Sequence, residues 1–139
     1  MQDLKKQVNT HKETMSLQVL TKKNASCNDL LCAVYNLNPV DLEIFYILAG
    51  GGPASLDDLA QRMKRDRSTV HRSLQKLVSN QLCYKETRTI KDGGYYHVYS
   101  AREIPKIKAE AEHRVDEITA GLGRMLRNFE SDIRKHCCK

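Results

Sequence analysis

The spacing of apolar residues along the chain changes twice and divides it into segments of different predicted structure. Between residues 28 and 80, apolar side chains recur every three or four positions, which places them on one face of an α-helix. Between residues 82 and 101, Tyr, Thr, Val and Ile dominate, a composition typical of β-strands. Beyond residue 102 the helical spacing returns. The pattern predicts a group of helices, then a pair of strands, then a final long helix.

Capping residues and helix breakers predict where the first helices begin and end. Asn28 is the expected cap of a short helix. The residues on one side of that helix are Leu31, Val34 and Tyr35. Asn38 followed by Pro39 predicts the next start, because Pro at the first helical position loses no needed N–H. After the short helix come three more, and the first of these should end at residues 50–53 (GGGP). Its expected core-facing residues are Leu42, Phe45, Ile47 and Leu48.

Two further helices are expected before the strands. Ser55, with Asp58 three residues later, resembles a capping box and predicts a helix start. The expected buried stripe of this helix is Leu56, Leu59, Ala60 and Met63. Asp66 is the expected cap of a third helix, residues 66–80, whose last residue, Asn80, tolerates the left-handed conformation of a helix end. The dry side of the third helix carries Val70, Leu74 and Leu77.

The strand-like segments on either side of residues 91–94 (KDGG) predict a two-stranded hairpin over residues 82–101, with Lys91 and Asp92 at its tip. Helix, turn, helix and hairpin in this order is the winged helix-turn-helix arrangement. The expected fold class is therefore mainly α with a small β-hairpin wing, and the expected domain covers residues 27–102. Residues 1–26 are left as an N-terminal arm, in which the apolar patch around Met15 to Leu20 can be a short strand or a short helix.

The C-terminal segment, residues 103–139, is predicted to form one long helix. Its apolar residues follow one another at intervals of 4, 3, 4, 3 and 4, a heptad spacing that lets one helix pack along another as a coiled coil. These residues are Ala111, Val115, Ile118, Leu122, Met125 and Phe129. With no Trp and only two Phe, a lone monomer would have a modest core, so a homodimer is expected. The alternative to a homodimer is packing of this helix on its own domain. Gly121 and Gly123 allow a bend in the helix.

The outer side of the third helix, opposite Val70, carries hydrogen-bond donors. The residues on or beside this side are Ser68, Thr69, His71, Arg72, Gln75 and Lys76. No Asp or Glu occurs between Arg67 and Lys85. A surface that approaches phosphates has a physical reason to exclude carboxylates, because each would add repulsion and a desolvation cost. Arg can bridge guanine O6 and N7 and Gln can pair with adenine, so these side chains suit a DNA major groove.

The positive charge of the chain is concentrated in its middle third. Lys and Arg outnumber Asp and Glu by 23 to 17 overall, and by ten to five within residues 55–102. Such a surface favours a polyanion as partner. No apolar run approaches the roughly 18 residues of a membrane span, and the N-terminus lacks a signal peptide's apolar stretch. A cytoplasmic protein with five reduced cysteines is therefore expected.

Three stretches of the chain carry a resemblance to a known family. They are LNPVDLEIFYILAGGGPASLDDLAQRM, RDRSTVHRSLQKLV and GGYYHVYSA. Over about residues 28–102 the chain resembles the winged helix-turn-helix domain of the TrmB-like archaeal transcriptional regulators, which are related to the MarR and ArsR groups. The resemblance implies that the third helix enters the major groove and that the wing touches the backbone or minor groove of double-stranded DNA.

The resemblance also implies roles for single residues. The implied groove-facing residues are Arg67, Ser68, Thr69, His71, Arg72 and Gln75, and the implied wing contacts are Arg88 and Lys91. The family pattern has Gly at positions 64 and 81 and an apolar residue at 65, where this chain has Lys64, Gln81 and Arg65. Lys64, Arg65 and Lys76 add positive charge on the DNA side. A sugar ligand is not inherited, because only about 37 residues follow the wing, too few for the family's effector domain.

Other chemistry finds less support in the sequence. Cys27, Cys32, Cys83, Cys137 and Cys138, with His136, invite a metal or redox-sensor reading, yet no CxxC or HxxxH spacing is present. No nucleophile and base signature predicts an enzyme, and no cofactor or metal is expected. The sequence is best interpreted as a homodimeric, sequence-specific DNA-binding regulator of a pseudo-palindromic operator. The alternatives are a winged-helix protein-interaction module of the transcription machinery and a thiol-based redox-sensing repressor.

Overall fold

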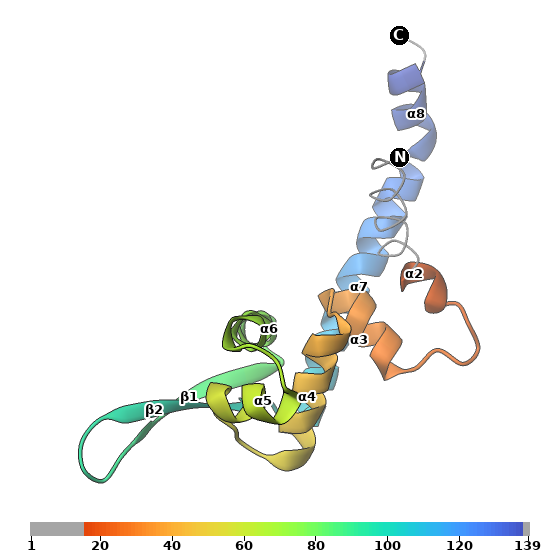
Figure 1. The fold of residues 1–139 in the computed structure, drawn as a ribbon. Helices are drawn as coiled ribbons and strands as arrows, with labels where there is room; N and C mark the ends of the chain where they lie inside the picture. The colour runs from red at the N-terminus through yellow and green to blue at the C-terminus, as the bar shows by residue number, and fades with distance from the viewer. Residues whose placement is uncertain (1–15, 138–139) are drawn as a thin grey trace, which may run out of the picture. The chain divides into compact units, whose positions relative to one another are not determined.

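A computed structural model describes residues 16–137, which form helices and one two-stranded sheet (Figure 1). The helices before the sheet are α2 (Ser16–Val19), α3 (Cys27–Tyr35), α4 (Pro39–Gly51), α5 (Leu56–Met63) and α6 (Arg67–Ser79). The strands β1 (Cys83–Thr89) and β2 (Tyr95–Ala101) follow, and then α7 (Ile104–Arg127) and α8 (Phe129–Cys137). The order of helix, turn, helix and hairpin is the one that the sequence predicts. The chain divides into two compact units after Glu103.

Helix α4 begins and ends where the sequence predicts. The Asn38 side chain accepts a hydrogen bond from the Asp41 N–H at 2.8 Å, and the Asn38 N–H donates to the Asp41 carboxylate at 2.9 Å. This reciprocal pair satisfies two N–H groups that a helix start leaves without partners. After Gly51 the chain turns at Gly52, whose φ of 83° suits glycine. The buried face of α4 differs from the expected one, because Ile44 is fully buried whereas Leu42 and Ile47 are only half-buried.

Helix α3 begins two residues before the expected start. Ser26 is its cap, and the Ser26 N–H donates to the Asp29 carboxylate at 2.9 Å. The prediction that Asn28 caps this helix is wrong, since the Asn28 side chain accepts a hydrogen bond from the Tyr46 hydroxyl of α4. Before α3, the apolar patch forms the short helix α2, while residues 1–15 lie outside the described part of the chain.

The core of the first unit lies where α4, α5 and α6 meet the base of the hairpin, as Figure 1 shows. The predicted dry side of α6 is confirmed, because Val70, Leu74 and Leu77 have no exposed surface. The other residues with 1% or less exposed are Ile44, Asp41, Leu59, Leu82 and Cys83. Burial of each large apolar side chain contributes about 1.5–3 kcal/mol, so this cluster fixes how α6 is rotated about its axis.

The turns on either side of α6 keep the geometry that glycine would allow. Lys64 and Gln81 adopt left-handed φ values of 55° and 63°, at the two positions where the resembled family has Gly. The Arg65 N–H donates to the Ala60 carbonyl at 3.1 Å and so closes the end of α5. The residue expected to be left-handed at the end of α6, Asn80, instead has φ −89°, and the left-handed position falls one residue later.

The hairpin is antiparallel, with Cys83 opposite Ala101 and Thr89 opposite Tyr95. Gly93 and Gly94 at its tip have φ values of 97° and 94°, which explains why glycine is used there. The base is held by two hydrogen bonds between Tyr99 and Ala54, of 2.8 and 3.0 Å, so the wing is fixed to the loop before α5. Side chains near the tip are exposed.

In the second unit, the interruption of the expected long helix lies at Asn128, between α7 and α8. Gly121 and Gly123, where the sequence allows a bend, are both inside α7. Helical hydrogen bonds continue across the interruption, since the Asn128 N–H donates to Arg124 O at 3.2 Å and the Asp132 N–H donates to Asn128 O at 2.9 Å.

The left-handed turn after α5 yields a stability prediction. Lys64→Gly is expected to raise the free energy of unfolding by about 0.5–1 kcal/mol, because relief of left-handed strain exceeds the entropy that glycine adds to the unfolded chain. Urea denaturation measures the difference. The control Gln61→Gly, inside α5, should instead lower the free energy of unfolding by about 1 kcal/mol. Destabilisation by both variants would contradict strain at Lys64.

Candidate nucleic-acid interface

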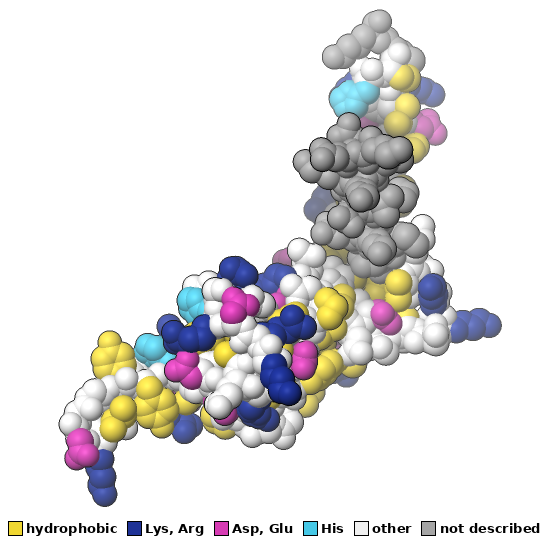
Figure 2. All heavy atoms as spheres, viewed as in Figure 1, with side chains coloured by type: hydrophobic (Ala, Val, Ile, Leu, Met, Phe, Trp, Pro, Cys, Tyr) yellow, Lys and Arg dark blue, Asp and Glu magenta, His cyan; other side chains and the backbone are white. Residues whose placement is uncertain are grey.

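The side of α6 opposite its buried stripe is open to solvent. Arg67, Ser68, His71, Arg72 and Gln75 are exposed, and Thr69 is half-buried. The structure therefore presents the predicted donor residues outward from a helix whose other side is fixed in the core. Figure 2 shows Lys, Arg and His side chains over α5 and α6, with Asp and Glu side chains between them.

The first turn of α6 is organised by the carboxylate of Asp66. It accepts hydrogen bonds from the Ser68 hydroxyl, from the Thr69 hydroxyl at 2.6 Å and from the Thr69 N–H at 3.4 Å. The two hydroxyl bonds, Ser68 first, lower the pKa of Asp66 to about 2, so the cap stays ionised well into the acid range. Ser68 and Thr69, expected to face the groove as donors, donate their hydroxyl protons to this cap, and the Thr69 hydroxyl oxygen accepts from Arg72 Nη2 at 3.4 Å.

A carboxylate from the neighbouring helix enters the surface that the sequence of α6 keeps free of acids. Arg67 Nε donates to Asp57 Oδ1 of α5 at 2.5 Å, and both side chains are exposed. Beside this pair lies an open hollow of about 440 Å³ lined by Leu56, Arg67, Ser68 and His71. The sequence does not predict this pair, because no local pattern connects Asp57 with Arg67.

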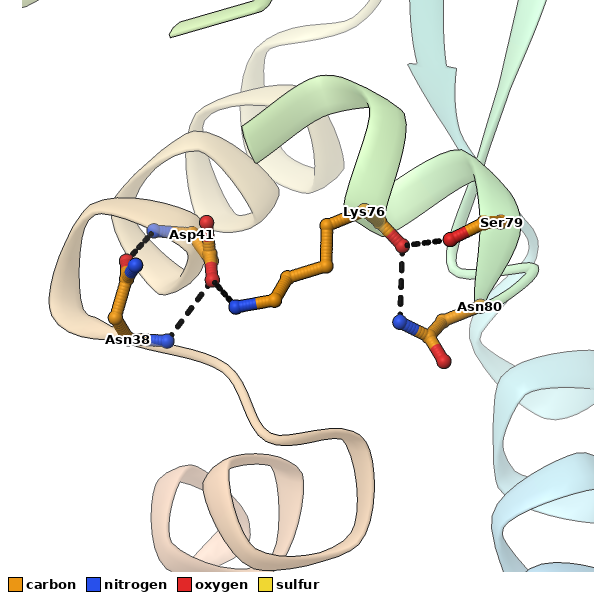
Figure 3. A network of polar contacts seen from close by, with 5 residues as sticks. All are labelled: Asn38, Asp41, Lys76, Ser79 and Asn80. Atoms are coloured by element: carbon orange, nitrogen blue, oxygen red, sulfur yellow. Dashed lines mark hydrogen bonds and ion pairs between the residues drawn. The ribbon is translucent and has the colours of Figure 1, made fainter. Parts of the chain in front are cut away.

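Lys76 is turned toward the core side of α6. Its Nζ lies 2.8 Å from Oδ2 of Asp41, whose side chain is 1% exposed (Figure 3). The same Oδ2 accepts the Asn38 N–H, so Asp41 both caps α4 and holds α6. Lys76, expected among the DNA-side charges, thus has its ammonium group in an ion pair between two helices. The sequence signal that could have found this pair is an Asp on the otherwise apolar buried face of α4.

The end of α6 is fixed at the same residue. The Lys76 carbonyl accepts hydrogen bonds from Ser79 Oγ at 3.0 Å, Asn80 Nδ2 at 2.9 Å and the Asn80 N–H at 3.1 Å (Figure 3). The Asn80 N–H makes the last regular helical hydrogen bond, and the two side-chain donors reinforce it at the same carbonyl. Lys76 therefore has two structural roles. Its side chain holds α6 against α4, and its carbonyl holds the C-terminal turn of α6.

The wing carries cations and aromatic rings. Arg88 Nη2 lies 3.8 Å from Glu86, and Lys91 is exposed at the tip beside Gly93 and Gly94. Tyr95 is 67% exposed, and its ring meets that of His97 edge to face, with centroids 5.7 Å apart. Sequence reasoning counted these aromatics as strand formers only, although the alternation of side chains along β2 already places Tyr95 and His97 on one face.

Two of the cysteines, Cys32 and Cys83, lie in environments that favour the thiol. Burial raises the pKa of Cys83 to about 12, and burial followed by repulsion from Asp29 raises the pKa of Cys32. Cys27 is exposed and its Sγ lies 3.6 Å from the Tyr46 hydroxyl. Cys138 lies outside the described residues. Within residues 16–137, no group of three or more His, Cys, Asp or Glu side chains could hold a metal ion.

An apolar face is exposed on α7 and α8. Of the predicted seam residues, Ile118, Leu122, Met125 and Phe129 are exposed. Val115 is half-buried, and Ala111 is only 8% exposed within the single chain, so little of its surface is left for a partner. Leu126 and Ile133, which the heptad pattern missed, extend the exposed face, and the six exposed side chains range from 45% to 71% exposed.

Within the described residues, no helix has both the length and the apolar character needed to cross a membrane.

Two solved structures share this fold. A possible transcriptional regulator from Methanosarcina mazei Go1 is similar with a TM-score of 0.67 and 23% sequence identity, over 78% of this chain and 95% of that one. The ST1889 protein from the archaeon Sulfolobus tokodaii is similar with a TM-score of 0.57 and 18% identity, over 68% of this chain and 93% of that one. The class of protein is thus the winged-helix class, as the sequence predicts.

A sequence relative identifies the family. The uncharacterized protein MJ1503 of Methanocaldococcus jannaschii is 30% identical over 103 residues, which cover 74% of this chain and 78% of MJ1503. The chain belongs to the same family as MJ1503. In addition, residues 36–101 match the family model described as HVO_A0114, a span that contains α4, the helix-turn-helix and the whole hairpin.

The ion pair between α4 and α6 yields a second prediction. Lys76→Met is expected to lower the free energy of unfolding by about 1–3 kcal/mol, because it leaves the buried Asp41 carboxylate without its cation. Urea denaturation measures this loss. The double variant Asp41→Asn/Lys76→Met should recover part of it, because it also removes the unpaired carboxylate. Arg72→Met, which removes an exposed cation from the same helix, should change the value by less than about 0.5 kcal/mol. Equal losses of stability in Lys76→Met and Arg72→Met would refute a stabilising role for the Asp41–Lys76 pair.

Proposed function

We propose that this protein is a sequence-specific, double-stranded DNA-binding transcriptional regulator of the TrmB-like type that acts as a homodimer. The observation that carries the proposal is the exposed donor side of α6, which is held by a fully buried stripe on the opposite side. A helix of this width fits the major groove, and its Arg and Gln side chains match guanine and adenine edges. The description of the M. mazei structure as a possible transcriptional regulator agrees with this function.

The proposed division of labour follows the order of the chain. Residues 1–26 are an arm, residues 27–102 bind DNA and residues 103–139 dimerise. The proposed DNA contacts are Lys64, Arg65, Arg67, Ser68, Thr69, His71, Arg72 and Gln75 around α6, with Arg88 and Lys91 on the wing. We omit Lys76, because contact with a phosphate would require its ammonium group to leave a buried carboxylate.

A second copy of the chain is the proposed partner of the apolar face on α7 and α8. Charged residues on these helices form pairs along their own helix, such as Lys108 with Glu112 at 3.9 Å and Arg134 with Glu130 at 3.7 Å. The apolar face is therefore the part of the surface that gains most from leaving water. In a dimer with two-fold symmetry, two α6 helices would enter successive major grooves about 34–36 Å apart, which requires a pseudo-palindromic site.

The DNA contacts are separable by mutation. Arg72→Ala is expected to cost about 1–3 kcal/mol in binding to the preferred site and to relax the base preference there, because a base contact is lost. Lys91→Ala should weaken binding to all sequences alike and lower the slope of log K against log salt by about one, because a phosphate contact is lost. Fluorescence anisotropy at several salt concentrations measures both effects. Operator affinity of Arg72→Ala equal to that of the parent would remove Arg72 from the interface.

The dimer is testable through its apolar face. Ile118→Glu and Leu122→Glu are expected to convert the dimer to a monomer, because each places a carboxylate among apolar side chains. Sedimentation equilibrium measures the mass. Ala120→Glu, an exposed residue outside the heptad seam, is the matched control and should leave the dimer intact. An unchanged mass in both seam variants would exclude this face as the interface.

A further inference from the structure

The ion pair between α5 and α6 constrains the residue that opens the donor side of α6. Asp57 accepts from Nε of Arg67, the guanidinium nitrogen nearest the backbone, at 2.5 Å. The two residues come from consecutive helices and meet beside the hollow that Leu56 and Ser68 also line. Because a guanidinium is rigid, a partner at Nε restricts the directions that the whole group can take.

A contact at Nε does not use the end-on pair of N–H donors of Arg67, one on each terminal nitrogen. A pair of parallel N–H donors is the arrangement that bridges O6 and N7 of guanine, and no other base pair edge offers two acceptors in that position of the major groove. An unrestrained arginine would sample many rotamers and would serve phosphates as readily as bases. A fixed one presents its donor pair in one direction.

We infer that Asp57 is a specificity-determining residue that orients Arg67 for guanine at one base pair of the site. The inference rests on the proposed DNA-binding function. It names guanine as the base that Arg67 contacts. Asp57 has a second effect through its charge. As an exposed carboxylate on the DNA side, it repels the phosphates of every sequence, which lowers specific and non-specific affinity by about the same factor.

The neighbouring residue provides a matched control. Asp58 also lies in the first turn of α5, is exposed as well, at 51% against 76% for Asp57, and pairs with Arg62 of its own helix at 3.6 Å. Removal of either carboxylate changes the net charge and the helix dipole interaction equally. Only removal of Asp57 frees the Arg67 guanidinium.

Selection of preferred sites from randomised DNA duplexes, followed by affinity measurements on single base-pair variants, tests the inference. Asp57→Ala is expected to lower the preference for guanine at one base pair about two- to fivefold, the range for loss of an exposed ion pair. Arg67→Ala should lose the same preference about tenfold or more, and Asp57→Ala/Arg67→Ala should lose no more than Arg67→Ala. Asp57→Asn, whose amide oxygen still accepts from Nε, should keep most of the preference.

Asp58→Ala should leave every base preference unchanged while it strengthens binding to all sequences, as both Asp57 variants also should. Thermal unfolding of each variant confirms that it is folded. If the parent selects a site and Asp57→Ala behaves as Asp58→Ala does at every base pair, the inference is overturned and the proposed function stands. If the parent selects no duplex, the proposed function fails and the inference fails with it.

Discussion

Burial of three residues on one side of α6 is the constraint on which the rest of the interface depends. Val70, Leu74 and Leu77 are inaccessible to solvent, and the helical repeat then fixes which residues must face outward. A rotation of α6 large enough to hide Arg72 would bring apolar side chains into water, at a cost of about 1.5–3 kcal/mol each. The outward direction of the polar side is therefore a consequence of hydrophobic packing and needs no contact of its own.

Hydrophobic packing fixes the rotation of α6 but leaves its two ends to polar contacts. At the first turn, the Asp66 carboxylate gathers Ser68 and Thr69, and at the last turn Lys76 is paired with Asp41. A buried ion pair is weak evidence for net stability, because desolvation offsets much of the attraction. It is more specific than an apolar contact, however, since a shift of one residue in the packing of α6 on α4 would leave a charge unpaired. The pair therefore favours one placement of the helix.

The same contacts sort the polar residues of the interface into different roles. The Lys76 ammonium and the hydroxyl protons of Ser68 and Thr69 bind within the protein. His71 and Gln75 are exposed, and Arg67 is exposed but oriented by Asp57. A cationic surface on which each charge were mobile would attract any polyanion. Charged side chains that are held in place and partly neutralised favour a ligand whose acceptors lie where their N–H donors point. Such a surface therefore selects among polyanions, whereas mobile charges attract all of them.

The sequence by itself determined the elements and their order, because those depend on short-range signals. Asn38 and Pro39 start α4, Asp66 caps α6, residues 91–94 turn the hairpin, and the spacing of Val70, Leu74 and Leu77 marks the buried side of α6. Only the tertiary structure decided which residues meet across elements. Asp41 and Lys76 are 35 residues apart, and Asp57 reaches Arg67 from another helix. Such pairs depend on the crossing of two helices, which no local pattern encodes. For the same reason Ile44, rather than Leu42, became the buried residue of α4.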